Sequence, residues 1–329
     1  MTGSELAHTS PAEPALNPAK FRDSFITAKG ERRASVSLRR LRTLWFNTGT
    51  QCNLACRNCY IESSPRNDRL VYLSAADVST YLDEIECDRL GTEEIGFTGG
   101  EPFMNPQFPA MLEDSLSRGF HVLVLTNAMR PMMKLQEPLL ALNTRFPRRL
   151  VIRVSLDHYG PAWHEAERGS RSWAPTLAGL TWLCRGGFTV RVAGRRFSGE
   201  TDGALRAGYA RLFREQDLPI DAGDTEQLVL FPEMDATKDV PEITTACWGI
   251  LGISPDAVMC ASSRMVIKRK GAPHPAVIAC TLLPYDARFE LGRSLREAGG
   301  AVPLNHPHCA RFCVLGGGSC SAPAPPSVA

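Results

Sequence analysis

Long apolar runs are absent from this sequence. No stretch of its 329 residues approaches the roughly 18 consecutive apolar residues that a membrane-spanning helix needs. The first residues also lack a positively charged segment followed by an apolar one, which is the pattern of a secretory signal. These absences argue against a helical membrane anchor, so we expect a cytoplasmic protein without a membrane partner.

A net excess of charge is also absent. The chain carries 37 Lys and Arg residues against 35 Asp and Glu residues, for a formal net charge of +2 at pH 7. A charge so close to zero gives no electrostatic basis for a nucleic-acid partner. The hydrophobic fraction of 43% and the charged fraction of 22% are those of an ordinary globular protein, long enough for one sizeable core plus an appended module.

Cysteine, in contrast, is abundant. Without an export signal, the 11 cysteines indicate metal ligands more than disulfides, because thiols stay reduced in the cytoplasm. Three of them lie within residues 52–59 and six follow residue 246, whereas Cys87 and Cys184 stand alone. We expect the two isolated cysteines to be inert core thiols and the two groups to bind metal.

The first group is the loop Cys52-Asn-Leu-Ala-Cys56-Arg-Asn-Cys59, which directly follows the apolar run 41–46. Iron–sulfur cubanes are normally held by four cysteine thiolates. A loop with three leaves one iron for a ligand from outside the protein, much as a catalytic zinc keeps an open position. The alternative is zinc itself, because Cys-x2-Cys is a frequent zinc half-site, although a structural zinc needs a fourth protein ligand.

Segments typical of strands and helices alternate from residue 41 onward. Repeated βα units predict a parallel sheet with helices outside, and six of them predict an α/β fold, a partial (β/α)6 TIM-like barrel. Ser74 and Asp77 form a predicted capping box at the start of one helix. The strand candidates are residues 41–47, 94–98, 121–126, 151–155, 189–193 and 227–231. The helix candidates are residues 74–90, 107–117, 134–145, 174–184 and 203–215.

Polar motifs follow these strand candidates. In parallel α/β sheets and barrels, ligands bind at the carboxyl ends of the strands. The cysteine loop therefore shares one predicted face with the segments that follow the other strands. These segments are residues 99–102, 126–127, 155–157, 194–196 and 232–233.

The cysteine loop and the Gly-Gly-Glu-Pro sequence after the second strand candidate resemble the two signatures of the radical S-adenosylmethionine (SAM) enzymes. The resemblance implies a [4Fe–4S] cluster on Cys52, Cys56 and Cys59, with SAM chelating the open iron. Such enzymes cleave SAM reductively to a 5′-deoxyadenosyl radical that abstracts hydrogen from a substrate. It also implies an electron donor such as flavodoxin or ferredoxin.

The same resemblance assigns cofactor contacts to particular residues. Gly99 and Gly100, without β-carbons, would let the backbone approach SAM closely and adopt a positive φ. Glu101 would accept hydrogen bonds from the methionine ammonium. The alternatives for the polar residues are helix caps and surface ion pairs, and for Tyr60 a place in the core. The remaining predicted cofactor contacts are Tyr60, Pro102, Ser155 and Asp157.

The second group of cysteines lies where Gly and Pro accumulate, as in small modules held by metal. It resembles a SPASM or shorter twitch domain, the auxiliary-cluster extension of the family. It departs from the SPASM pattern because it has six cysteines instead of the usual seven and because the Cys309-x3-Cys313 spacing is wider than that pattern has. Six thiols could complete one [4Fe–4S] cluster, or serve two if His306 or His308 contributes or one cluster stays incompletely ligated; a zinc knot is the alternative. The predicted ligands are Cys247, Cys260, Cys280, Cys309, Cys313 and Cys320.

We therefore predict a disordered basic tail at 1–36, a radical SAM core at 37–235 and a small, Cys-rich, loop-rich auxiliary iron–sulfur region at 236–329. His164 and the Arg-Gly pair at 168–169 resemble a stretch common in peptide-modifying members, which favours a peptide or protein side chain as substrate. The alternative is a small metabolite or cofactor precursor, because only about forty residues precede the barrel, few for a separate recognition domain. A non-catalytic iron–sulfur or zinc scaffold is the alternative from another class.

Overall fold

A computed structural model describes residues 14–319. Its strands are β1 Ser35–Val36, β2 Thr43–Asn47, β3 Glu94–Thr98, β4 His121–Thr126, β5 Leu150–Ser155, β6 Thr189–Arg196, β7 Leu228–Pro232, β8 Ser263–Ile267, β9 Ala276–Ile278, β10 Glu290–Gly292 and β11 Val302–Pro303. Its α-helices are α1 Ala75–Cys87, α2 Phe108–Ser117, α3 Arg130–Met133, α4 Gln136–Arg145, α5 Pro161–Arg168, α6 Trp173–Arg185, α7 Asp202–Glu215 and α8 Cys247–Leu251.

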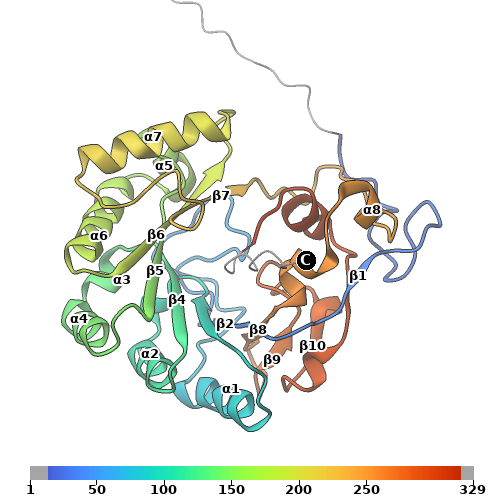
Figure 1. Cartoon of the computed structure of the whole chain (residues 1–329), viewed down its shortest axis with the longest axis horizontal. Helices are drawn as coiled ribbons and strands as arrows, with labels where there is room; N and C mark the ends of the chain where they lie inside the picture. The colour runs from blue at the N-terminus through green and yellow to red at the C-terminus, as the bar shows by residue number, and fades with distance from the viewer. Residues whose placement is uncertain (1–13, 320–329) are drawn as a thin grey trace, which may run out of the picture.

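A nine-stranded sheet organises the molecule, in the order β10-β9-β8-β2-β3-β4-β5-β6-β7. The six expected strands, β2 to β7, pair in parallel with their sequence neighbours, and the longer helices lie along the outer face of the curved sheet (Figure 1). The predicted parallel α/β barrel fragment is thus confirmed. No helix within residues 14–319 combines the length and apolarity needed to cross a membrane.

Local sequence signals located the helices well. The predicted capping box opens α1: the Ser74 hydroxyl accepts from the Asp77 amide at 3.0 Å, and the Asp77 carboxylate accepts from the Ser74 amide at 2.9 Å. Helix α5 was not predicted, because it spans only eight residues and the two side chains that it buries, His164 and Glu167, are polar. Cys87, expected in the core, is exposed at the end of α1.

The C-terminal region extends the main sheet. Strand β8 pairs in parallel with β2, on the side opposite β3, and β9 and β10 continue the sheet in antiparallel fashion. On the inner face of the sheet, Trp45 and Leu123 of the barrel strands share a hydrophobic cluster with Met265 and Phe312. The region expected as a loop-rich module therefore has no separate core, and the boundary at residue 235 stays a prediction.

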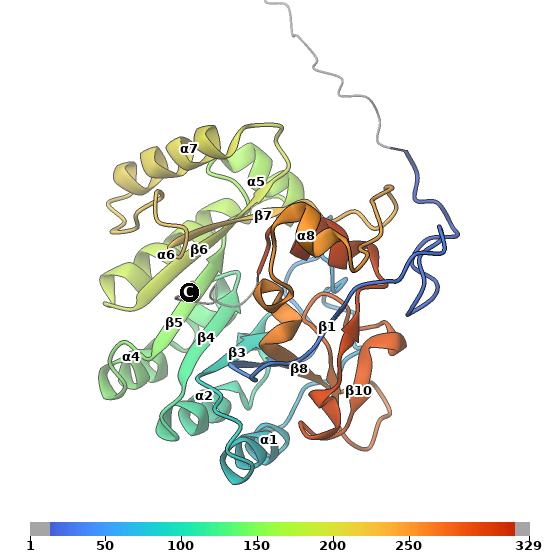
Figure 2. The same cartoon turned by 45° about the vertical axis from the view of Figure 1, so that its right-hand side comes forward.

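The segment from residue 14 to residue 36, which we call the N-terminal strap, corrects the expected disordered tail. Phe21 and Val36 are buried, and β1 pairs with β11. Figure 2 shows the strap, in blue, running along the C-terminal region, in orange and red. The strap packs there because its apolar side chains, Phe21 and Val36 among them, join the hydrophobic cluster of the C-terminal region. Residues 1–13, which belong to the same expected tail, lie outside the described residues.

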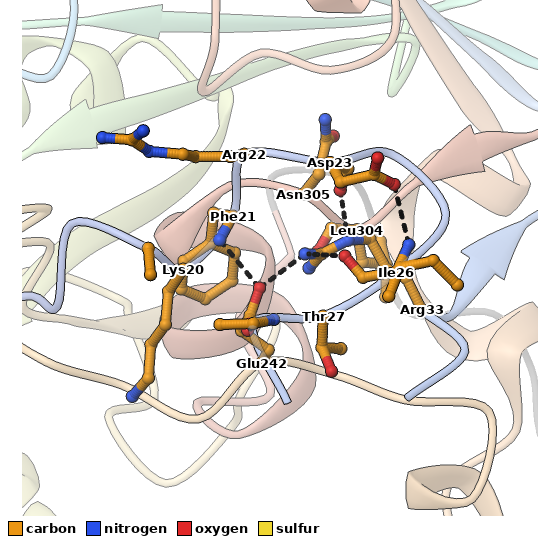
Figure 3. A network of polar contacts seen from close by, with 12 residues as sticks. Lys20, Phe21, Arg22, Asp23, Ile26, Thr27, Arg33, Glu242, Leu304 and Asn305 are labelled. Atoms are coloured by element: carbon orange, nitrogen blue, oxygen red, sulfur yellow. Dashed lines mark hydrogen bonds and ion pairs between the residues drawn. The ribbon is translucent and has the colours of Figure 1, made fainter. Parts of the chain in front are cut away.

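A buried ion pair fixes the strap (Figure 3). The Arg33 guanidinium donates to Glu242, and the two side chains are 0% and 5% exposed. Glu242 also accepts from the backbone amides of Phe21 and Ala28, each at 2.7 Å. Arg33 further donates to the backbone carbonyls of the strap and of Leu304. Arg33, which lies in the basic tail predicted to be disordered, is thus part of the interior.

Candidate active site

A cavity of about 190 Å³ opens at the carboxyl ends of the parallel strands. The structure gathers there most of the residues predicted to form the site around the cysteine loop. Their shared position follows from the parallel sheet, which brings all the strand ends to one edge. The predicted site residues that line the cavity are Cys52, Cys56, Cys59, Tyr60, Gly99, Gly100, Ser155 and Asp157.

The cysteine loop presents three thiols to this cavity. Burial raises the pKa of Cys52 to about 12 and also raises that of Cys56. Two backbone N–H groups donate to sulfur, that of Leu54 to Cys52 at 3.4 Å and that of Ser63 to Cys59 at 3.3 Å. Because metal ligation requires the thiolate, an N–H donor at the sulfur favours the form that binds a cluster.

The donor set fits a cubane with one open iron. Among the described residues, no cysteine besides Cys52, Cys56 and Cys59 lines the cavity. Within residues 14–319, no three His, Cys, Asp or Glu side chains are arranged to hold a single metal ion. A cubane takes one thiolate per iron, so its ligand sulfurs surround the cluster and need not meet at one point. The role of the three cysteines as cluster ligands stays a prediction.

Gly99 and Gly100 are required by the protein's own backbone. Gly99 has a φ of +142°, and a β-carbon there would lie 2.5 Å from the carbonyl oxygen of Gly49. A β-carbon on Gly100 would lie 2.0 Å from the carbonyl oxygen of Gln51. The missing side chains therefore let β3 end against the segment that leads into the cysteine loop. Both glycines also line the cavity, and their contact with the cofactor stays a prediction.

Glu101 lies behind the cavity wall. Its carboxylate accepts from the Thr126 hydroxyl at 2.7 Å and from the Asn127 amide at 2.9 Å, both at the end of β4. Burial raises its pKa to about 7. Neither Glu101 nor the buried Pro102 lines the cavity. The structure gives Glu101 contacts inside the protein, and the expected contact with a SAM ammonium group stays a prediction.

Asp157 forms a bidentate ion pair that sequence reasoning missed. Arg168 of α5 donates to its two carboxylate oxygens at 2.8 and 3.0 Å, and both residues line the cavity. Burial alone would raise the pKa of Asp157, but the Arg168 guanidinium holds it below its ordinary value. His164, on the same helix, does not line the cavity, and burial lowers its pKa to about 4. It is therefore neutral at physiological pH.

A second network ties the cysteine loop to the barrel. Glu167 accepts from the Asn58 side-chain amide at 3.0 Å and from Arg195 of β6 at 2.6 Å. Arg195 also reaches Glu233, just after β7, at 3.4 Å. Arg195 follows a predicted strand, so its position was foreseeable. Glu167 had no sequence signal, because helix α5 itself was not predicted.

The C-terminal region completes the cavity wall. Leu282 and Phe312 line the cavity together with Phe231 and Met234, and the rings of Phe231 and Phe312 lie 5.6 Å apart. These apolar side chains thus line the same cavity as the cysteine loop. The sequence did not predict that the last third of the chain contributes to the same site.

The predicted ligands in the C-terminal region lie in or against the inner hydrophobic cluster. Cys260 and Cys309 are buried and Cys280 is half-buried. Burial raises the pKa of Cys309 well above its ordinary value, and the charges of Cys280 and Cys260 add to the rise. Their role as ligands stays a prediction, as it does for Cys247 and Cys313. Cys320 lies outside the described residues.

Comparisons with known proteins agree with this geometry. Residues 46–204 match the profile described as the radical SAM superfamily. The bacteriocin subtilosin biosynthesis protein AlbA of Bacillus subtilis is 33% identical over 45% of this chain and 32% of its own length. The mycofactocin maturase MftC of Mycobacterium ulcerans is 28% identical over 42% of this chain and 35% of its own. The matched segment thus spans about a third of these curated relatives.

Solved structures share the fold. Streptococcus suis SuiB bound to its precursor peptide SuiA superposes with a TM-score of 0.57 at 12% identity, over 78% of this chain and 63% of that one. The protein anSMEcpe with bound SAM gives a TM-score of 0.56 at 13% identity, over 78% of this chain and 79% of that one. The cysteine loop and the Gly-Gly-Glu-Pro sequence both lie within residues 46–204, the segment that matches the radical SAM superfamily, and Cys52, Cys56, Cys59, Gly99 and Gly100 line one cavity.

Proposed function

We propose that this protein is a radical SAM enzyme that abstracts hydrogen from a peptide or protein side chain. The observation that carries the proposal is the convergence of Cys52, Cys56 and Cys59 with Gly99, Gly100 and the pair of Asp157 and Arg168 on one cavity. When bound, a [4Fe–4S] cluster and SAM supply a one-electron cleavage of the sulfonium to a 5′-deoxyadenosyl radical.

The chain's own residues would bind, orient and shield these groups. The three thiols would hold the cluster. Arg168, fixed on one side by Asp157, presents a cation that would match the SAM carboxylate, and Ser155 also lines the cavity. The apolar wall of Phe231 and Phe312 excludes water, which protects a reactive radical from side reactions.

The peptide as substrate is supported by the relatives. AlbA is named for the biosynthesis of a bacteriocin and MftC for the maturation of mycofactocin, and SuiB was captured with a precursor peptide. Sequence reasoning independently found a segment around His164 that resembles peptide-modifying members. The small-metabolite alternative gains no comparable support from the named relatives.

We also propose an auxiliary iron–sulfur cluster in the C-terminal region, with Cys260, Cys280 and Cys309 as its central ligands. Cys260 and Cys309 belong to one hydrophobic cluster, and Cys280 packs against it. An auxiliary cluster on these thiols would lie in the C-terminal region, which also supplies part of the apolar cavity wall. From there it would exchange an electron with a substrate radical. A small electron carrier such as flavodoxin or ferredoxin would reduce the enzyme.

Anaerobic reconstitution tests both proposals. We expect about eight irons per chain, since each cubane holds four, and 5′-deoxyadenosine after addition of dithionite and SAM. Cys56→Ala should abolish 5′-deoxyadenosine, Cys309→Ala should retain it with about four irons fewer, and the control Cys184→Ala should behave as wild type. Intact clusters without cleavage would contradict the enzymatic proposal, and four irons in the wild type would contradict the auxiliary cluster.

Deuterium transfer tests the substrate class. Extracts of the source cells grown in heavy water are separated by filtration into peptide and small-molecule fractions and supplied to the reconstituted enzyme. We expect deuterium in 5′-deoxyadenosine only with the peptide fraction, and loss of that label after protease treatment. Label from the small-molecule fraction would instead favour a metabolite.

A further inference from the structure

Asn127 connects the end of β4 to the cysteine loop. Its side-chain nitrogen lies 3.8 Å from the Cys52 sulfur and 3.0 Å from the side-chain oxygen of Asn53. Asn127 is only 4% exposed and lines the cavity. The residue is therefore placed to act on a group bound by Cys52, although neither sequence motif of the site includes it.

The orientation of the Asn127 amide follows from its other partner. Its side-chain oxygen accepts from the backbone amide of Met129 at 3.1 Å. An asparagine amide has its acceptor on one side and its two N–H donors on the other. With the oxygen held by a backbone donor, the NH2 group must face Cys52 and Asn53.

The backbone of Asn127 is held on both sides. Its N–H donates to Glu101 at 2.9 Å, and its carbonyl accepts from the Thr176 hydroxyl of α6 at 3.2 Å. Glu101 is fixed in turn by Thr126 at 2.7 Å. The carboxylate of the Gly-Gly-Glu-Pro sequence thus aligns the residue that touches the cysteine loop.

The thiols of the loop differ in their hydrogen-bond donors. Cys52 receives two N–H groups, from Leu54 and Asn127, whereas Cys59 receives one from Ser63. A side-chain oxygen, that of Asn53, also lies 4.0 Å from the Cys52 sulfur. A thiolate there would be repelled by this oxygen, and the Asn127 NH2 group, which donates to both atoms, offsets the repulsion.

We propose that Asn127 is a positioning residue that holds the Cys52 thiolate and raises the reduction potential of the cluster. The inference rests on the proposed function, because it requires a cluster on the cysteine loop. Hydrogen bonds to ligand sulfurs withdraw negative charge, and reduction adds negative charge to the cluster. Asn127 therefore stabilises the reduced cluster more than the oxidised one and eases its reduction by a cellular donor.

Redox titration followed by electron paramagnetic resonance tests the proposal. The cluster on the loop is identified by the change in its signal when SAM is added. Asn127→Leu removes the donor at similar size, and Asn127→Asp replaces it with an oxygen. We expect both variants to shift the midpoint potential of this cluster downward, the aspartate variant further.

Asn143→Leu is the matched control, because the Asn143 amide donates only to the backbone of Gly186 and Gly187. Its midpoint potential should equal that of the wild type. An unchanged potential in Asn127→Leu and Asn127→Asp, at full iron content, would overturn the inference while leaving the proposed function intact. A wild-type protein that binds no cluster on the loop would instead overturn the proposed function.

A measurement on the wild type covers the case in which the variants lose the cluster. Protein labelled with ¹⁵N in asparagine side chains is reduced, and electron spin echo modulation is recorded without SAM. We expect a weakly coupled ¹⁵N at the cluster, because Asn58 directs its amide to Glu167 and Asn53 directs its own to Met129. Absence of any such coupling would overturn the inference.

Discussion

Glu101 is a buried carboxylate whose partners are neutral. The Thr126 hydroxyl and the backbone amides of Asn127 and Phe103 are its hydrogen-bond donors. Neutral donors stabilise a buried charge less than an adjacent cation does. Burial accordingly raises the pKa of Glu101 to about 7 from its ordinary value of 4.5.

This raised pKa predicts a stability that falls with pH. Between pH 4.5 and 7 the folded protein binds a proton at Glu101 that the unfolded chain has released, so the free energy of unfolding decreases as pH rises. Glu101→Gln should remove this decrease, which amounts to about 1.4 kcal/mol for each pH unit crossed between the two pKa values. Urea unfolding of the cluster-free protein at pH 5 and pH 8 measures it. Glu113→Gln, at an exposed carboxylate, should keep the wild-type slope, and an equal slope in Glu101→Gln would contradict the prediction.

At the residue scale, sequence reasoning found the groups with local signals. Cysteines at fixed spacing and paired glycines after a strand are recognisable within a few residues. Their partners are not, since Asn58 and Glu167 lie 109 residues apart and Asn127 and Cys52 lie 75 apart. For the same reason the sequence could not show that Gly99 and Gly100 also pack against the backbone of Gly49 and Gln51, and their contact with the cofactor stays a prediction.

At the element scale, the structure depends on two segments that bury polar residues. Helix α5 supplies Glu167 and Arg168 to the site, and its sequence marks are Pro161 at its first position and Gly169, with a φ of +96°, directly after its last residue. Strand β8 begins with Ser263 and Arg264, which look like surface residues. Arg264 is nevertheless 1% exposed, because backbone carbonyls satisfy its guanidinium.

The ion pair of Arg33 and Glu242 should determine whether the N-terminal strap stays docked. Removing one partner leaves a buried charge, which costs about 3 to 5 kcal/mol in such pairs. We expect Arg33→Ala to lower the free energy of unfolding by that order and to expose the strap to protease. Arg39→Ala is the control: its pair with Asp256 is 64% and 50% exposed and should contribute less than about 1 kcal/mol. Equal effects of the two variants would show that the strap is held by its apolar contacts alone.

At the scale of the whole molecule, we expect the two predicted structural regions to fold as one unit. Strand β8 covers the edge of β2, and the inner hydrophobic cluster takes residues from the strap, the barrel and the C-terminal region. Composition and spacing could not reveal this shared packing, because β2 and β8 are more than 200 residues apart in the sequence. The sequence indicated that the cysteine-rich end binds metal, but not that it belongs to the sheet.

Truncating the chain after residue 235 tests whether the two regions fold as one unit. The shortened chain would leave β2 as an open edge and would expose the remaining members of the inner cluster, such as Trp45 and Leu123, to water, so we expect aggregation and no cooperative unfolding transition. Circular dichroism during heating and light scattering measure both effects. Residues 236–329 supplied as a separate chain should partly restore solubility. A soluble, cooperatively folding fragment would instead establish an independent barrel domain.

The pairing of β2 with β8 also sets an order of events during synthesis. The cysteine loop leaves the ribosome soon after β2, whereas β8 begins at residue 263 and Phe312 follows later still. At usual rates of translation this leaves roughly ten to forty seconds between the two strands. During that interval the side of the site that Leu282 and Phe312 later close is open. If the cysteine loop binds the proposed cluster, we therefore expect a protein that delivers iron and sulfide to meet the growing chain through a wider entrance than the finished protein has.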